Sequence, residues 1–306
     1  MGILVIGATF VDIKGFPFDN YLPTGRNAGR VEYVHGGVAR NVAEDIANVE
    51  LRPTFLSIVD DTPMGDAVVQ KLRNHKVNTD YLLTRPDGMG TWLAVFDNNG
   101  DVAGSISKRP NMYPIAELLE EKGDEIFSRV SSVVLEIGLD KEIVKGTLAL
   151  AKKHNVKTFA LVANMSIAAE RRDLLQQFDC VICNQQEAGI LFLDDYDDKT
   201  PEEMRDLLAD RILAANIPSM VVTMGGNGAV YANLTGEKGI CPVKKVHVKD
   251  TTGAGDAFCA GVAIGMTYGK AMAEAVEIGT TLAASVITSS ENVCPRFRPE
   301  EFGLEI

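Results

Sequence analysis

The apolar residues of this chain recur in short continuous runs that alternate with amphipathic stretches. Residues 3–7 form a run without a polar position, which is typical of a parallel strand covered on both faces. Similar runs and segments of helical period follow one another, so the pattern predicts a βα rhythm. The predicted strands are 3–7, 53–59, 131–136, 157–161, 179–183 and 220–223. The predicted helices are 38–49, 63–73, 141–154, 184 onward, 200–215, 257–266 and 271–287.

Three segments depart from this rhythm. Residues 14–34 read as irregular, with several prolines and glycines, and two strand-like runs, 91–96 and 102–107, flank the hairpin signal Asp97-Asn98-Asn99-Gly100. We expect both regions to form a small β appendage over one edge of the main sheet. Alternation in 243–249 predicts one further strand. The predicted fold class is therefore α/β, a mainly parallel sheet with helices on both faces and a small β-sheet, in one domain spanning 1–306.

The composition of the chain disfavours some classes of binding partner. The 306 residues are 46% hydrophobic, and their net charge is 30 − 42 = −12, which disfavours nucleic-acid backbones and anionic membranes. No apolar run approaches the roughly 18 residues of a membrane span, and no signal peptide is evident. Five cysteines include Cys180 and Cys183 in an apolar run, where buried thiols are expected rather than a metal site. We expect a cytoplasmic protein.

The stretch 250–258, Asp-Thr-Thr-Gly-Ala-Gly-Asp-Ala-Phe, is the strongest chemical signal. Gly253, Ala254 and Gly255 open a predicted helix, and the free amides of a helix N-terminus bind anions such as phosphate. Asp256 follows in the first turn. It could serve only the helix dipole, or it could take a proton from a hydroxyl that attacks a phosphate. The nonapeptide alone leaves both interpretations open.

Other polar residues stand near predicted strand ends or helix starts. Asp12 lies just beyond a strand, where open α/β sheets bind ligands, although a surface turn would also explain it. Gly36 and Gly37 begin a helix that carries Asn41, which can both donate to and accept from sugar hydroxyls. Glycines there can equally serve packing, and Arg40 could simply be solvated.

Two further positions could face the same cleft, Glu136 and Asn164, because they end neighbouring strands. Asn184 and Glu187 have capping-box spacing, which a functional role does not exclude. Trp92, in the hairpin, could stack on a base, join a contact between two appendages or stabilise the hairpin.

Taken together, these motifs resemble the ribokinase-like (PfkB) sugar and nucleoside kinases. The stretch 250–258 is similar to the C-terminal signature of that family. The segment 35–41 resembles its G-G-x-x-x-N motif, 184–187 its N-x-x-E motif, and 223–228 its T-x-G-x-x-G motif, all in the expected order. The resemblance implies a three-layer α/β/α fold. It also implies that the appendage, about 13–35 and 89–108, is a lid that closes over the sugar.

The resemblance also implies a role for each matching residue. Asp256 would be the base, and the amides of Gly253, Ala254 and Gly255 would stabilise the transferred phosphoryl group. The substrate would be held by Asp12, Gly36, Gly37, Arg40 and Asn41. Glu136 is added to these substrate-binding residues because it ends a predicted strand that faces the same cleft. ATP would lie along Asn184, Thr223, Gly225, Gly228 and Thr252. Glu187 would order Mg²⁺ through water, and Asp250 and Thr252 match positions that bind K⁺. Met165 follows Asn164 where the family often has proline.

The implied activity is ATP-dependent phosphorylation of a primary hydroxyl on a small-molecule sugar or nucleoside. Residues 36–41, Gly-Gly-Val-Ala-Arg-Asn, resemble the G-G-V-x-R-N motif of pseudouridine kinases, and 93–100 resembles their L-D-N-x-G run. Pseudouridine therefore ranks first, and ribose or another sugar or nucleoside second. A homodimer through the lid is a further expectation. The alternative from a different class is a non-catalytic sugar- or nucleotide-binding regulator, which would not need Asp256.

Overall fold

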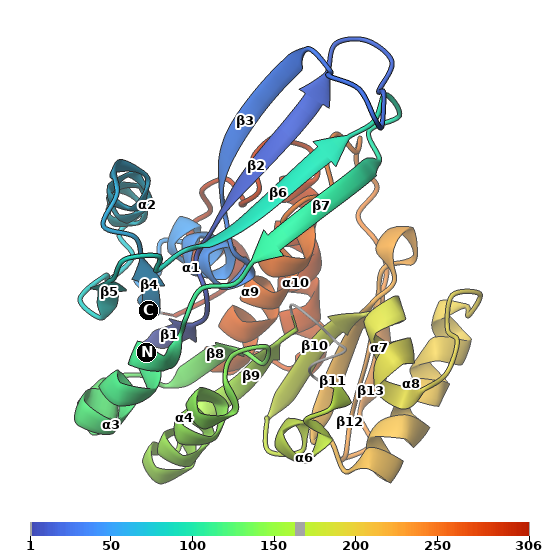
Figure 1. The fold of residues 1–306 in the computed structure, drawn as a ribbon. Coiled ribbons are helices and arrows are strands. Elements are labelled where there is room, and N and C mark those ends of the chain that lie inside the picture. Colours follow the sequence, from blue (N-terminus) through green and yellow to red (C-terminus); the bar gives the residue numbers. More distant parts are fainter. Residues whose placement is uncertain (1, 163–168, 306) are drawn as a thin grey trace.

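Two sheets of unequal size organise the part of the chain that the computed structural model describes, residues 2–162 and 169–305 (Figure 1). Within these residues, the large sheet has nine strands in the order β13-β12-β11-β10-β9-β8-β1-β4-β5. Its first seven strands along the chain are β1 (Ile3–Ile6), β4 (Thr54–Val59), β5 (Leu82–Thr84), β8 (Ser132–Glu136), β9 (Lys157–Leu161), β10 (Cys180–Asn184) and β11 (Ser219–Thr223). These pair in parallel, whereas β12 (Ala229–Asn233) and β13 (Lys238–Cys241) form an antiparallel edge.

Helices cover both faces of the large sheet. Apolar side chains on one face of it pack in a cluster with α3 (Tyr113–Phe127), α4 (Lys141–His154), α6 (Arg172–Leu175), α7 (Gln185–Phe192) and α8 (Pro201–Ala215). Those on the other face pack with α1 (Val38–Asn48), α2 (Pro63–Asn74), α9 (Ala254–Thr267) and α10 (Met272–Val286). Short 3₁₀ turns follow β11, at Gly225–Asn227, and precede the C-terminus, at Pro299–Phe302.

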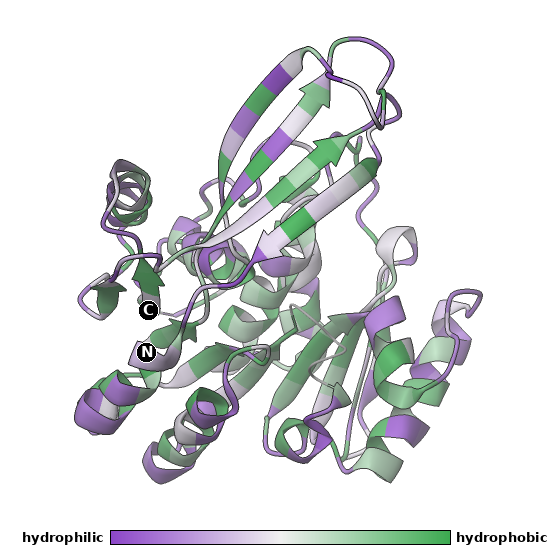
Figure 2. Ribbon diagram, viewed as in Figure 1, coloured by the Kyte–Doolittle hydropathy of each residue, from purple (hydrophilic) through white to green (hydrophobic). Residues whose placement is uncertain are grey.

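Strand β1 shows why the run 3–7 carries no polar residue. Leu4 and Ile6 pack on the α3 and α4 side, and Ile3 and Val5 pack on the α1 and α9 side. Both faces are therefore buried, which confirms the predicted central strand and the three-layer α/β/α fold. In Figure 2 the strands of the large sheet are mostly hydrophobic, while hydrophilic colour marks many outer positions of the helices.

Local signals set several helix boundaries correctly. Helix α4 spans the predicted residues 141–154, and α2 begins after Thr62, whose side chain accepts a hydrogen bond from the Gly65 amide. Helices α7 and α8 both begin with reciprocal capping boxes, at Asn184 and Thr200. Cys180 and Cys183 are buried free thiols, as expected. Within residues 2–162 and 169–305, every helix is too short or too polar to span a bilayer.

The small sheet is the predicted appendage, but one part of its description was wrong. Residues 14–34 are not irregular throughout, because they contain most of β2 (Phe10–Pro17) and β3 (Gly29–Gly36). These join β6 (Gly90–Phe96) and β7 (Val102–Lys108) in the order β3-β2-β6-β7. Pro17 and Gly29 face each other at the strand ends, so they bound the pairing and do not interrupt it. Figure 1 shows this sheet projecting above the carboxyl ends of the large sheet.

The strand predicted over 243–249 is absent. Strand β13 ends at Cys241, Pro242 follows, and residues 242–248 have no assigned secondary structure in this described region. Val246 and Val248 are 40% and 51% exposed, so their alternation does not bury one face against a sheet. Both valines line a cavity instead. The valines of 243–249 alternate with polar residues because they line a cavity, and this pattern was mistaken for that of a strand in a sheet.

Helices α9 and α10 approach each other through glycine. A Cβ added to Gly261 would lie 2.5 Å from the Gly279 Cα, and one added to Gly279 would lie 2.7 Å from the Phe258 carbonyl oxygen. These distances leave no space for a methyl group between the two backbones. The close contact fixes α9, whose N-terminus carries residues 253–256, against α10.

We expect Gly261→Ala to lower the free energy of unfolding by about 1–3 kcal/mol, the usual cost of overpacking. Its control is Gly146→Ala in α4, where an added Cβ meets nothing within 4 Å. That change should raise stability by up to about 1 kcal/mol, because alanine favours a helix interior over glycine. Urea unfolding of both variants measures the difference. Equal changes in the two proteins would show that the α9–α10 contact is not tight.

Candidate active site

The N-terminus of α9 is built from a glycine turn. Gly253 has a φ of 83°, and a Cβ there would lie 2.0 Å from the Asn292 carbonyl oxygen, so glycine is required. The Ala254 amide donates to the Thr251 carbonyl oxygen at 3.2 Å. Among the described residues, the amides of Gly253 and Gly255 have no acceptor. A Cβ on Gly255 would meet nothing within 4 Å, so these donors border open space.

Two cavities meet at this turn. One has a volume of about 460 Å³ and extends toward α10, and the other, of about 660 Å³, lies under the small sheet. We call them the α10 cavity and the lid-side cavity. The turn contributes to both: Thr251, Ala254 and Gly255 line the α10 cavity, and Thr252, Gly253 and Asp256 line the lid-side cavity. A short peptide segment with free amides thus separates two small-molecule-sized spaces.

Asp256 is a half-buried carboxylate at the edge of the lid-side cavity. Burial raises the pKa of Asp256 to about 7, and the charges of Glu136 and Glu187 act in the same direction. The Asn41 side-chain amide donates to Asp256 Oδ2 at 2.6 Å and, with the Arg40 charge, opposes that rise. The carboxylate can therefore exchange a proton near neutral pH, as an efficient general base must.

Asn41 is itself held in place by a residue that the sequence did not reveal. The Asn292 side-chain amide donates to Asn41 Oδ1 at 3.3 Å and to the His35 carbonyl oxygen at 3.0 Å. Asn292 is 8% exposed and also lines the lid-side cavity. No spacing pattern could have linked it to Asn41, because the two residues are 251 positions apart.

Asp12, Gly36 and Gly37 come together in the small sheet, where β2 begins and β3 ends. Asp12 and Gly37 line the lid-side cavity, and burial raises the pKa of the Asp12 carboxyl. A Cβ on Gly36 would lie 2.5 Å from Asp12 Oδ1, so this glycine makes room for the carboxylate. Gly37 has a φ of 97° and stands immediately before α1.

Glu136, at the end of β8, also lines the lid-side cavity. Its Oε2 accepts a hydrogen bond from the Ala8 amide at 2.9 Å. Burial raises the pKa of Glu136, while this hydrogen bond and the Arg109 charge lower it. Asn164, the residue expected to face the same cleft, lies outside the described residues.

Arg40 fits neither expectation, substrate contact or solvation. It is 1% exposed, is absent from the described lining of both cavities, and forms a buried ion pair with Glu44. Its guanidinium also donates to the carbonyl oxygens of His35 and Gly36. Arg40 lies on the inner side of α1, where buried charges require partners. It therefore supports the 35–37 turn from behind and acts on Asp256 only through its charge.

Comparison with known families matches residues 2–294 to the pfkB family carbohydrate kinases. The chain belongs to the pfkB family. This pfkB kinase is therefore a phosphotransferase that acts on a hydroxyl group, and the resemblance found in the sequence is confirmed. Kinases of this kind use ATP with a divalent metal and act on small-molecule sugars or nucleosides.

Individual relatives agree with the family. The pfkB kinase is 35% identical over 292 residues to a guanosine-inosine kinase of Exiguobacterium acetylicum, covering 95% of each chain. It is 27% identical over 279 residues to a pseudouridine kinase of Escherichia coli, covering 90% of this chain and 86% of that protein. The structure of Arabidopsis thaliana ribokinase complexed with ribose and ATP matches with a TM-score of 0.86 at 20% identity, covering 98% and 97% of the two chains. That likeness supports the fold.

The residues expected along ATP surround the α10 cavity of the pfkB kinase only in part. Thr223, Gly225 and Gly228 line it, and a Cβ on Gly228 would lie 2.2 Å from the Cys241 carbonyl oxygen. Its far wall consists of small and apolar side chains that include Thr280, Ala283, Ala284, Val246 and Val248. A flat aromatic ring fits such a wall. Asn184 lies outside the described lining, as does Thr252, which is on the lid side.

Candidate cation ligands are present but sparse. Glu187 Oε2 accepts from the Asn184 amide at 2.8 Å, and its charge reaches Asp256. One carboxylate is sufficient for Mg²⁺ that keeps its waters and binds phosphates, so Glu187 fits that ion. In the described part of the chain, no group of three or more acidic, His or Cys side chains could hold a metal. Asp250 Oδ1 accepts from the Thr252 amide at 2.8 Å, so this pair already forms a side-chain-stabilised turn.

Sequence reasoning missed several residues of the lid-side cavity. Phe10, Arg109, Met112 and Asp140 line it beside Trp92, which was considered. Trp92 is half-buried on the cavity face of β6 and packs edge-on against Phe96. The four missed residues come from loops and from the first position of β2, and they carry no spacing signature.

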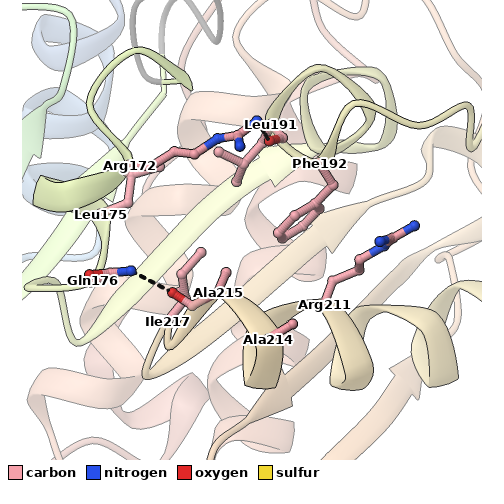
Figure 3. Close-up of a pocket in the computed structure, with 9 residues that line it drawn as sticks. All are labelled: Arg172, Leu175, Gln176, Leu191, Phe192, Arg211, Ala214, Ala215 and Ile217. Carbon is pink, nitrogen blue, oxygen red and sulfur yellow. Dashed lines mark hydrogen bonds between the residues drawn. The ribbon is translucent and has the colours of Figure 1, made fainter.

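A separate cavity of about 260 Å³ lies between α6, α7 and α8 (Figure 3). Its walls are mostly aliphatic, and Gln176 bridges it by donating to the Ala215 carbonyl oxygen at 2.8 Å. Its two arginines are already engaged, Arg172 with the Leu191 carbonyl and Arg211 with Asp194. The two cavities beside residues 251–256 remain the candidate active site.

We expect Glu136→Gln to lower the pKa of Asp256 and Asn41→Leu to raise it. The first change removes a nearby negative charge, and the second removes a hydrogen bond to the charged carboxylate. Carbon NMR of protein labelled at aspartate carboxyls, titrated around pH 7, measures both shifts. The control is Glu142→Gln, an exposed acid at the start of α4. Shifts of the same sign in both site variants would contradict this electrostatic description.

Proposed function

We propose that this kinase transfers the γ-phosphoryl group of ATP to the 5′-hydroxyl of a ribonucleoside. One observation carries the proposal: residues 251–256 separate two cavities and present free amides at their junction, with Asp256 beside them on one side. Phosphoryl transfer needs a donor and an acceptor in line, with positive dipoles between them. The arrangement supplies those dipoles and a base on the acceptor side.

The chain's own residues would then divide the work. Asp256 takes the proton from the attacking hydroxyl, and Asn41 keeps the carboxylate oriented. The amides of Gly253 and Gly255 stabilise charge on the group in transfer. The Ala254 amide contributes less, because it donates to Thr251. Asp12, which lines the lid-side cavity, accepts hydrogen bonds from ribose hydroxyls.

We place ATP in the α10 cavity, with its base on the small residues of α10 and its phosphates along Gly225 and Gly228. Mg²⁺ would be held by the phosphates and, through water, by Glu187. Bound there, it would neutralise phosphate charge. We also propose a K⁺ site beside Asp250 and Thr252, and this proposal is supported only by the resemblance to the family motif.

The acceptor we propose is a purine ribonucleoside with a 6-oxo group, guanosine or inosine. The 35% identity to a guanosine-inosine kinase, over 95% of both chains, supports this choice. Pseudouridine, which the segment 36–41 ranked first, is the second candidate, supported by that motif and by 27% identity to a pseudouridine kinase. Both acceptors offer a ribose 5′-hydroxyl to Asp256.

The small sheet would act as the lid over the acceptor, and its outer face would join two copies of the chain. Asp12, Trp92 and Ser107 are register partners, and all three line the lid-side cavity. Their neighbours in sequence face the opposite side. That outer face exposes the apolar residues Val31, Tyr33, Leu93 and Ile106 to between 41% and 70%. Contiguous apolar surface of this kind marks interaction sites, and a second copy offers an identical face.

We expect Asp256→Asn to lower kcat with guanosine by roughly 10²–10⁴-fold, the range of general-base catalysis. The Michaelis constant for ATP should change little, because the amides belong to the backbone. For the wild type, kcat/KM should rise as the pH increases through about 7, because the charged form of Asp256 is the base. Coupled assays that compare the turnover in K⁺ with that in Na⁺ at equal ionic strength test the proposed K⁺ site. An active Asn variant would overturn the role of Asp256.

We expect the wild-type protein to be a dimer in solution and Ile106→Asp to make it a monomer. The control is Leu213→Asp in α8, since Leu213 and Ile106 are both 70% exposed. Light scattering coupled to size-exclusion chromatography gives the mass of each protein. A monomeric wild type, or dissociation caused equally by both substitutions, would contradict a dimer through the small sheet.

A further inference from the structure

Arg109 is an unpaired cation in the wall of the lid-side cavity. It follows β7 directly and makes no hydrogen bond or ion pair with another residue in the described ranges. Its neighbour Lys108 differs, since that ammonium pairs with Asp87 at 2.8 Å and lies outside the described lining of the cavity. Arg109 is near enough to Glu136 for its charge to lower the pKa of that carboxyl. Arg109 is exposed, so its guanidinium donors face solvent and can bind a ligand in the cavity.

Asp140 is the matching acceptor. It stands at the N-cap position of α4, yet its side chain makes no capping hydrogen bond. Aspartate at this position usually accepts from the helix amides. Asp140 instead lines the lid-side cavity with its carboxylate uncommitted. The cavity wall therefore offers one forked donor and one acidic acceptor, both without partners in the described protein.

Aromatic side chains line the same space. Phe10, on β2, and Trp92, on β6, both belong to the face of the small sheet that borders the cavity. Trp92 and Asp12 are register partners on neighbouring strands, so an aromatic ring stands beside the carboxylate proposed to hold ribose. Faces of this kind stack on nucleobases without selecting among them. Selection must come from polar groups at the edge of the base.

We propose that Arg109 and Asp140 read the edge of a 6-oxopurine. Arg109 donates to O6 and N7, and Asp140 accepts from N1–H, and in guanine also from the 2-amino group. The fork of arginine matches O6 and N7 of guanine in geometry. This inference rests on the proposed function and adds to it the residues that choose the base.

The same two residues reject adenine. Adenine carries an amino donor where a 6-oxopurine has O6, so it opposes the Arg109 donors. Its N1 is an acceptor, which opposes the Asp140 carboxylate. A polar site left unpaired by the wrong ligand discriminates far more strongly than an apolar one. The cavity volume, about 660 Å³, lies within the roughly 300–1,000 Å³ of small-molecule sites, so a purine nucleoside can occupy it.

The experiment compares guanosine, inosine, adenosine and purine riboside, which lacks both O6 and N1–H. The proteins are the wild type, Arg109→Met, Asp140→Ala and the control Lys108→Met, which removes the adjacent cation that is paired outside the cavity. Steady-state kinetics with ATP gives kcat/KM, and calorimetry without ATP gives Kd for each nucleoside. Circular dichroism checks the fold of each variant.

Arg109→Met should lower kcat/KM for guanosine and inosine by roughly 10–100-fold, the scale of one bidentate arginine contact. It should affect purine riboside much less, and Lys108→Met should match the wild type. Asp140→Ala should also lose more with guanosine than with purine riboside. The wild type should prefer inosine to purine riboside and guanosine to adenosine.

Equal losses with all four nucleosides in Arg109→Met would overturn the inference, and so would a wild type that favours adenosine or treats inosine and purine riboside alike. The wild-type comparison decides the question even if a variant fails to fold. If no nucleoside is phosphorylated but guanosine binds in an Arg109-dependent way, the proposed function fails and the base recognition stands. If guanosine is phosphorylated but the reaction does not depend on Arg109, the proposed function stands and the base recognition by Arg109 fails.

Discussion

The hydrogen bond from Asn41 to Asp256 is the contact on which the site depends. It joins α1 to α9 across 215 positions of sequence, and both helices pack on the same face of the large sheet. The bond favours the charged carboxylate, while burial and nearby acids favour the neutral one. A shift in the position of either helix would therefore change both the direction and the acidity of the carboxylate. The glycine contact between α9 and α10 acts as a second restraint on the same helix.

Behind this bond lies a layer of buried charge. Glu44 and Asp45 on α1 are both 0% exposed, and burial raises the pKa of Asp45 well above its usual value. Arg40 is a fully buried cation of this layer, paired with Glu44 and bonded to the backbone at the end of β3. The half-exposed Lys71 also pairs with Glu44, at 3.3 Å. Removing one partner of such a pair leaves an uncompensated buried charge. The layer therefore fixes the connection between the small sheet and α1 more firmly than apolar packing alone would.

Much of the fold could be predicted because local signals agreed with the final packing. Helix α4 and strand β9 were predicted at their observed bounds, since periodicity, length and buried faces coincide there. Residues 14–34 were misread because pairing between strands distant in sequence outweighed their prolines and glycines. Alternation in 243–249 reflects a cavity and not a sheet. In each failure the deciding contact is non-local.

The residues of the candidate site likewise fall into those that the sequence could predict and those that it could not. Residues in short motifs, such as Asp256, Gly37 and Asn41, could be predicted for the candidate site from the sequence, and all three line the lid-side cavity. Arg109, Asp140 and Asn292 were missed because each comes from a different connection and is brought to the cavity only by the fold. Arg40 was predicted to hold substrate because it belongs to a motif, but a motif does not give the direction of a side chain, and here that side chain is buried against Glu44.

The wall shared by the two cavities has an evolutionary consequence. In the proposed mechanism, residues 251–256 contribute backbone amides and one carboxylate to the boundary between the cavities. The turn leaves no space for a side chain at Gly253, and Asp256 would be the base, so these two positions tolerate little change. The far end of the lid-side cavity is assembled from side chains on separate strands and loops, which can change one at a time. Lineages could thus exchange one acceptor for another while inheriting the transfer machinery intact. That independence suits a family whose relatives are named for guanosine, pseudouridine and ribose.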